Sequence, residues 1–291
     1  MVVMPANFAT EEERVKEQGA VNVLSRWYKP WFYKHVETML ADEHVKVEFI
    51  PLRDYYHRHT KSIFWELEEI IPFGNHPVFR WLLGWAVPPK VSFLKLTQTE
   101  KIIELYETQH VIQDMLVPAS ETAAALDVFD THYEIYPLWL CPFALMDRSD
   151  EVAEHSGFLR KPEHKLKGRK FEIFVDLGAY GVPRACKRKE PFNIVAVSRA
   201  VESWVASVRG YQMLYATSYQ TRGEFEAMFD HSAYFRLKRE LDPNGALPVI
   251  FDKVCKAGAS AWTSAEAKPA LSKTKAKTTT SGRGRARSKS S

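Results

Sequence analysis

The chain has 291 residues, of which 45% are apolar and 13% aromatic, so it can bury the core of one large or two small domains. Three widely spaced cysteines form no C-x-x-C pair, which indicates neither a zinc knuckle nor a disulfide framework. The formal charge of +4 comes from the C-terminal tail, which begins at about residue 263. From Lys268 onward there are eight basic residues and no acid, and the remainder has 32 basic against 36 acidic residues.

The first part of the chain reads as short strands alternating with helices. Thr10 caps an acidic first turn and Gly19 closes the same helix, while Pro30 stands at the first turn of the next. An apolar alternation with period two before Pro51 indicates a strand. The predicted strands are 2–8, 21–27 and 45–52, and the predicted helices are 10–19 and 29–41.

The second part mixes longer strands with amphipathic helices. Strand 171–181 is expected to run into a turn at its two glycines, and the polar stretch 147–169 reads as a loop. Such a mixture predicts an α+β fold with an antiparallel sheet flanked by helices. The predicted strands are 109–118, 133–143, 171–181 and 211–219, and the predicted helices are 99–107, 119–132, 196–210 and 221–255.

Targeting and membrane signals are weak. The N-terminus lacks the basic and apolar regions of a signal peptide, and no run of 18 apolar residues exists. The best candidate, "PVFRWLLGWAVPP" at 77–89, is too short to span a bilayer. It predicts a buried helix, or alternatively an interfacial one, because Trp81 and Trp85 lie one helical turn apart.

Residues 55–60, Tyr-Tyr-His-Arg-His-Thr, gather two imidazoles, a guanidinium and two phenols. In an extended conformation Tyr55, His57 and His59 would share one face. A His-x-His pair can bind zinc, but a third ligand is missing, so no metal site is predicted. The alternatives are a hydrogen-bonded polar seam, or a redox or acid–base site in which Arg58 steadies negative charge. Neither G-x-G-x-x-G nor a P-loop motif occurs.

Several stretches together resemble the delta-24-sterol reductases, the family of 24-dehydrocholesterol reductase and the plant diminuto/dwarf protein. They occur in the family's order from about residue 1 to about residue 259. The stretches are "WYKPWFYKHVE", "IPLRDYYHRHTKSIFWELEEIIPFGNHPVFRWLLGW", "VPPKVSFLKLTQ", "VIQDMLVP", "YPLWLCPF", "DLGAYG", "GYQMLYATSY" and "EFEAMFD".

The resemblance implies a flavoprotein of the vanillyl-alcohol-oxidase type, with an FAD-binding domain and a substrate (cap) domain. NADPH reduces FAD, which gives hydride to the side-chain double bond of a sterol such as desmosterol, at the cytosolic face of the endoplasmic reticulum membrane. Residues 1–262 correspond to the cap domain alone, and 263–291 are expected to be a disordered basic tail. We therefore expect FAD not to be held tightly by this chain alone, and a separate FAD-binding half to be a partner.

The same resemblance implies which residues form the site. The 55–60 patch is expected at the interface of flavin and sterol, aromatic residues of "YPLWLCPF" at the sterol pocket, and "GYQMLYATSY" near the flavin. The expected residues are Tyr56, His57, Arg58 and His59 for catalysis, Tyr136 and Trp139 for substrate, and Tyr215 and Tyr219 for the cofactor.

Two other functions remain open from the sequence. A non-catalytic sterol- or membrane-associating domain could use residues 77–89 and the basic tail for membrane-surface contact. A nucleic-acid role would rest on the tail alone. Because no aromatic residues are interleaved with its charges, specific nucleic-acid recognition is not expected.

Overall fold

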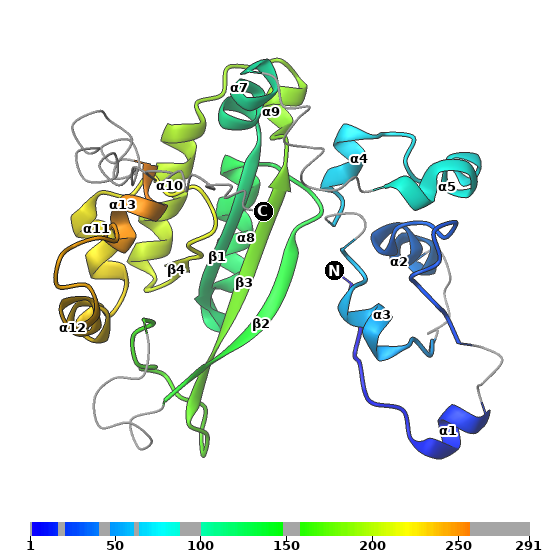
Figure 1. Ribbon diagram of the computed structural model, residues 1–291, viewed down its shortest axis with the longest axis horizontal. Helices are drawn as coiled ribbons and strands as arrows, with labels where there is room; N and C mark the ends of the chain where they lie inside the picture. The colour runs from blue at the N-terminus through cyan, green and yellow to red at the C-terminus, as the bar shows by residue number, and fades with distance from the viewer. Residues whose placement is uncertain are drawn as a thin grey trace, which may run out of the picture. The chain divides into compact units, whose positions relative to one another are not determined.

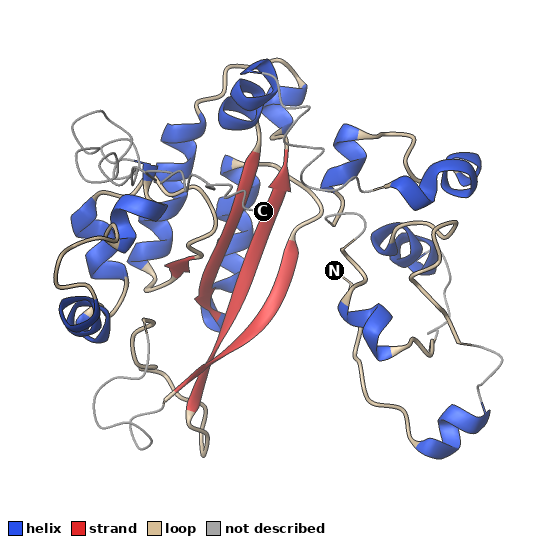
Figure 2. Ribbon diagram, viewed as in Figure 1, coloured by secondary structure: helices blue, strands red, loops and turns tan. Residues whose placement is uncertain are grey.

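The computed structural model describes residues 2–16, 21–40, 47–60, 64–87, 100–147 and 158–256 (Figure 1). The chain divides into two compact units. The first unit consists of Met1–Asp147 and Lys161–Ala216, and the second of Arg148–Arg160 and Thr217–Ser291. Helices and an antiparallel sheet make up the described residues, which confirms the predicted α+β class (Figure 2).

The sheet of the first unit has the strand order β2-β3-β1-β4, and every neighbouring pair is antiparallel. Its long central pair was predicted almost to the residue. The second strand begins six residues later than predicted, and the fourth is only two residues long. The strands are β1 (Val111–Pro118), β2 (Trp139–Met146), β3 (Phe171–Gly181) and β4 (Tyr211–Gln212).

The two faces of the sheet differ in chemistry. Met115 pairs with Leu177 in the register, and both side chains are completely buried. This apolar face carries α8 (Thr122–His132) and α10 (Ile194–Ser207), which pack against β1 and against each other. Residues of opposite parity, Asp114 among them, point to the other face because side chains alternate along a strand.

Helices join and precede the strands of the first unit. Trp31, Tyr33 and Leu67 form a small apolar cluster in the N-terminal part. The helices there are α1 (Glu11–Lys16), α2 (Phe32–Leu40), α3 (Leu52–Tyr56), α4 (Glu66–Ile70), α5 (Pro77–Leu83) and the 3-10 turn η1 (Gly84–Ala86). The remaining ones are α7 (Glu100–Gln109), the 3-10 turn η2 (Ala119–Glu121) and α9 (Arg184–Lys187).

Several local predictions were wrong. In the described parts of 2–8, 21–27 and 45–52, no strand forms; one isolated bridge joins Val21 to Phe49. These segments have strand-like patterns but gain no ladder of partners, on which a strand depends. Strand β3 continues through its glycines instead of turning.

The 77–89 segment is helical, as predicted, but its described residues do not form a buried helix. Trp81 is 68% exposed and Trp85 72%. The pattern alone could not separate a buried from an interfacial helix. No helix within the described ranges is long and apolar enough to cross a membrane.

The second unit is helical where it is described. Thr221 and Glu224 form a capping box at the start of its first helix, and Phe158 stacks on Phe229 at 4.5 Å. Its helices are α11 (Arg222–Met228), α12 (Ser232–Leu241) and α13 (Ile250–Val254). The predicted tail at 263–291 lies outside the described residues, as do Gly19, Pro88 and Pro89.

The buried side of β3 should dominate the stability of the first unit. We expect Leu177→Ala to lower the free energy of unfolding by about 2–5 kcal/mol, because it leaves a cavity between the sheet and its helices. Leu40→Ala, at a position 60% exposed, should change it by less than about 0.5 kcal/mol. Urea unfolding followed by circular dichroism checks both, and equal losses would contradict this packing.

Candidate active site

Two carboxyl groups lie on the polar face of the sheet. Asp114 of β1 stands opposite Gly178 of β3, and Asp176 stands opposite Leu116. Paired residues of antiparallel strands point to the same face, so Asp114 and Asp176 are diagonal neighbours. Asp114 is completely buried and Asp176 is half-buried. Both strands are otherwise largely apolar, so these acids are conspicuous within them.

Gly178 makes room for a phenol above Asp114. The hydroxyl group of Tyr180 donates a hydrogen bond to Asp114 Oδ1. A Cβ atom built on Gly178 would lie 2.6 Å from that hydroxyl oxygen and 2.7 Å from the ring. The absence of a side chain at 178 therefore allows Tyr180 to fold back along its own strand and reach the carboxylate.

Tyr215 contacts the same carboxylate from the segment after β4. Its side chain hydrogen-bonds to Asp114, and it also interacts with Tyr180. Burial, and then the bond to Asp114, raise the pKa of Tyr215 although 69% of the residue is exposed. The hydroxyl group is therefore the inner end of a side chain whose ring remains accessible. Burial and Asp114 also raise the pKa of Tyr180.

The two carboxyl groups share an environment that favours a bound proton. Burial, and secondly the charge of Asp114, raise the pKa of Asp176 to about 7. Burial raises the pKa of Asp114 as well, and the tyrosine hydroxyls oppose that rise. Among the described residues, Asp114 Oδ2 and Asp176 Oδ1 are buried and have no hydrogen-bond partner. The pair therefore titrates as a unit and is suited to hold a proton near neutral pH.

An aromatic wall adjoins the carboxyl pair. Phe64 stacks on Tyr180 with ring centres 5.1 Å apart, and Trp139 lies 5.1 Å from Phe64. His59 completes the wall at 4.7 Å from Phe64 and 5.2 Å from Trp139. Phe64 adopts a left-handed backbone with φ of 58°, which is costly for a bulky residue. The strain is tolerated where Phe64 covers Tyr180.

His59 is a neutral member of this wall. Burial, and then the charge of Arg58, lower the pKa of His59 to about 4. Neither ring nitrogen has a partner among the described residues, and both are buried. At neutral pH, His59 therefore offers one donor and one acceptor to a ligand rather than a positive charge.

Arg58 lies among rings. Its guanidinium carbon is 4.1 Å from the centre of the Tyr55 ring and 6.0 Å from that of Trp139. One guanidinium nitrogen, Nη1, donates to the carbonyl of Tyr55 at 2.8 Å. These cation–π contacts fix the guanidinium beside the aromatic wall.

The 55–60 patch is not extended, so Tyr55, His57 and His59 do not share one face as they would in a strand. Helix α3 begins after Pro51 and ends at Tyr56, and a turn follows. Arg58 and His59 therefore contact the wall. Tyr56 is exposed, and the imidazole of His57 is exposed and pairs with Thr60 at 3.3 Å.

Of the other predicted site residues, two lie at this site, one does not, and one belongs to the second unit. Trp139 belongs to the aromatic wall, and Tyr215 contacts the carboxyl pair. Tyr136 is 60% exposed, and its hydroxyl group donates to Asp130. Tyr219 is half-buried in the second unit, whereas Tyr215 belongs to the first.

Sequence reasoning missed Asp114, Asp176 and Tyr180 as site residues. The available signal was an acid inside the apolar strands "VIQDMLVP" and "FEIFVDLGAYG", since a charge in a buried strand is unusual. Among the described residues, no group of three or more His, Cys, Asp or Glu side chains is arranged to hold a metal ion.

The raised pKa of Asp176 predicts a pH-dependent stability. Its folded pKa of about 7 exceeds the ordinary 3.8, so its stabilising effect is present at low pH and is lost as pH rises through about 7. The asparagine side chain in Asp176→Asn has nearly the shape of a protonated aspartic acid and cannot ionise. The melting temperature of Asp176→Asn minus that of the unsubstituted chain should therefore increase by about 2–4 °C between pH about 4 and about 8.

Differential scanning calorimetry across that pH range measures this difference. Asp127→Asn, at an exposed position on α8, is the matched control and should give a difference that does not change with pH. Parallel melting curves for Asp176→Asn and the unsubstituted chain would rule out the raised pKa.

Comparison with known proteins gives relatives for most of the chain. It is 48% identical over 241 residues to the Delta(24)-sterol reductases of Rattus norvegicus and Homo sapiens, covering 83% of this chain and 44% of each relative. The Delta(24)-sterol reductase of Arabidopsis thaliana is 36% identical over 271 residues, covering 92% of this chain and 48% of that protein.

No family model matches the chain, and no solved structure matches it. The chain spans about half the length of the curated relatives it matches, as expected for their C-terminal portion. Identity of 48% over 83% of the chain, together with plant and worm relatives, makes this chain a homologue of the Delta(24)-sterol reductase family.

Proposed function

We propose that this chain is the substrate-binding part of a delta-24-sterol reductase that uses FAD and NADPH and reduces the side-chain double bond of sterols such as desmosterol. Its relatives are named Delta(24)-sterol reductases. The observation that carries the proposal is a buried carboxyl pair beside an aromatic wall on one sheet face. Alkene reduction needs both an apolar binding surface and a proton source.

The residues of this face fit a flat ring system with polar edges. Trp139 and the Tyr215 ring are accessible, while His59 and the carboxyl pair have buried polar atoms without partners among the residues that the structure describes. Tyr215 and His59 are the residues that would contact a flavin ring, which supplies hydride when bound. Because no glycine-rich phosphate loop occurs in this sequence, firm retention of FAD would depend on a separate FAD-binding half.

The sterol side chain is apolar, and the aromatic wall would bind it by excluding water. Trp139 and Phe64 offer ring faces, and the partly exposed Phe143 of β2 extends the same face. Arg58 fixes the orientation of the wall through its ring contacts. The geometry gives Tyr136 no comparable contact, because its hydroxyl group is directed to Asp130.

The proton would come from the carboxyl pair. Asp176 is the better donor because it is half-exposed and its pKa of about 7 keeps a proton available at neutral pH. The hydroxyls of Tyr180 and Tyr215 already bond Asp114 and hold it in place. The donor would deliver its proton to an alkene carbon, and the pair would then be reprotonated from solvent.

A chimera tests this function without assuming where the natural protein begins. The region of the rat reductase that matches this chain is replaced by this chain, and sterols from cells lacking the endogenous enzyme are analysed by mass spectrometry. We expect desmosterol to be converted to its reduced product. Asp176→Asn should lower the rate by roughly 10²–10⁴-fold, as for loss of a general acid, and Asp127→Asn should leave it unchanged.

The pH dependence separates a proton donor from a merely structural residue. The rate of the chimera should fall as pH rises through about 7, because Asp176 loses its proton there. A folded chimera that converts no sterol would refute the reductase proposal. Full activity of Asp176→Asn would refute only the assignment of the donor.

Association with a membrane surface is a second proposed role, which holds with or without catalysis. The exposed apolar residues of α5 and η1 favour it: Trp81, Leu82, Leu83 and Trp85. A location at the cytosolic face of the endoplasmic reticulum is part of the same proposal, supported by the family name and this surface. Cosedimentation with phosphatidylcholine vesicles should fall at least about fivefold for Trp81→Ser combined with Trp85→Ser; unchanged cosedimentation would contradict it.

A further inference from the structure

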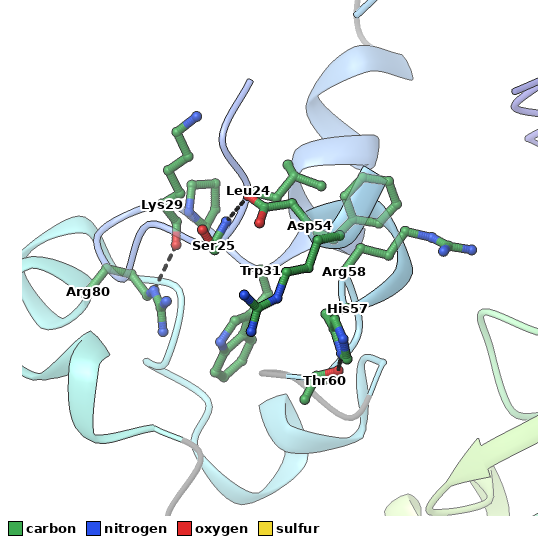
Figure 3. A pocket seen from close by; sticks show the side chains of 12 residues that line it. Leu24, Ser25, Lys29, Trp31, Asp54, His57, Arg58, Thr60 and Arg80 are labelled. Carbon is green, nitrogen blue, oxygen red and sulfur yellow. Dashed lines mark hydrogen bonds between the residues drawn. The ribbon is translucent and has the colours of Figure 1, made fainter. Parts of the chain in front are cut away.

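A pocket of about 430 Å³ lies in the N-terminal part of the first unit, lined by the segment before α2, by α3 with its following turn, and by Arg80 of α5. Figure 3 shows Arg80 and Lys29 on one side of it and α3 with Asp54 and His57 on the other. The lining residues that matter below are Lys29, Trp31, Arg53, Asp54, Arg58 and Arg80.

The charges around this pocket are unbalanced. The basic side chains that line it are Lys29, Arg53, Arg58 and Arg80, although the guanidinium of Arg58 lies beside the aromatic wall. Against them stands the single carboxylate of Asp54, which accepts a hydrogen bond from the backbone of Ser25 at 2.9 Å. Within the described part of the chain, no carboxylate oxygen lies within 4.0 Å of the guanidinium nitrogens of Arg53, Arg58 or Arg80. Guanidinium groups left without carboxylates around one cavity favour an anionic ligand.

Arg80 provides the independent evidence for a ligand. It is only 2% exposed, and its Nε donates to the carbonyl of Lys29 at 2.9 Å. Its Nη1 is buried and has no partner among the described residues. Buried arginines are normally paired, because an uncompensated buried charge is strongly unfavourable. An anion in the pocket would supply the missing partner.

The backbone holds this arginine in place. A Cβ on Gly84 would lie 2.4 Å from the carbonyl oxygen of Trp27 and 3.2 Å from Arg80 Cζ, so η1 packs tightly over the guanidinium. The guanidinium carbon also lies 5.7 Å from the centre of the Trp31 ring. Trp31 is itself 2% exposed, and its indole Nε1 is another buried donor that has no partner in the part of the chain the structure describes.

The donors identify the class of anion. Trp31, Arg53 and Arg80 offer N–H groups alone, and two guanidinium groups suit the several oxygens of a tetrahedral anion. A phosphate group occupies only part of 430 Å³, which leaves space for the molecule that carries it. We propose that this pocket binds a phosphate group of a larger ligand, either a nucleotide or a phospholipid headgroup. The proposal does not depend on the reductase function.

Isothermal titration of the full chain with inorganic pyrophosphate tests the site. We expect saturable binding, weakened about tenfold or more by Arg53→Gln, because a charge-assisted hydrogen bond to the anion is lost. Arg239→Gln, on the exposed face of α12, removes the same charge elsewhere and should bind as the unsubstituted chain does. Arg53→Lys should recover part of the affinity.

Two further titrations identify the source of the phosphate. NADP⁺ binding more tightly than NAD⁺ would indicate a nucleotide phosphomonoester, and preference for vesicles containing phosphatidic acid over pure phosphatidylcholine would indicate a lipid. Each preference must be lost in Arg53→Gln to count for this pocket. The absence of saturable pyrophosphate binding, or equal losses in Arg53→Gln and Arg239→Gln, would overturn the proposal.

Discussion

The polar face of the first unit depends on one buried carboxylate. Asp114 is completely enclosed, and it is accompanied by a glycine opposite and by two phenols that bond it. A buried charge is tolerated only where such hydrogen bonds replace water. The antiparallel register of β1 and β3 brings Gly178, Tyr180 and Asp176 to this carboxylate. A shift of the register by one residue would move these side chains to the other face, so the site depends on the pairing of the two strands.

This arrangement explains why neighbouring elements adopt costly conformations. Phe64 keeps a left-handed backbone where it stacks on Tyr180, and the indole of Trp65 donates to the Tyr180 carbonyl at 3.0 Å. Burial in the same wall lowers the pKa of His59 to about 4. Strain, an uncharged buried imidazole and carboxylate oxygens without partners in the described ranges gather at one face, which is typical of a functional site rather than of a core.

Local sequence patterns predicted those elements that are stabilised by nearby residues or that have a strongly periodic apolar sequence. The strand that contains Asp114, the helix Ile194–Ser207 and the cap at Thr10 all follow from such patterns. The segment 21–27 did not become a strand, although its residues favour one, because strand formation depends on partners far along the chain.

The site shows the same limit. Family resemblance directed attention to Arg58, His59 and Trp139; His59 and Trp139 belong to the aromatic wall, and Arg58 contacts it. The hydrogen bond between Asp114 and Tyr180 joins residues 66 positions apart, and no pattern within either strand specifies it. Charge inside an apolar strand was the only local sign of the carboxyl pair. The pocket at Arg80 likewise depends on segments that are brought together only by folding.

The most direct test of this account is the protonation state of the carboxyl pair at neutral pH. Infrared spectroscopy of the full chain, compared with Asp176→Asn, would detect a protonated carboxyl group by its C=O stretching band. Burial also raises the pKa of Glu66 to about 7, so the informative signal is the difference between the two spectra. The account predicts that the band at pH about 6 is weaker in Asp176→Asn than in the unsubstituted chain, and that this difference disappears as pH rises through about 7. Full ionisation of both carboxyl groups at pH about 6 would contradict the proposed proton source.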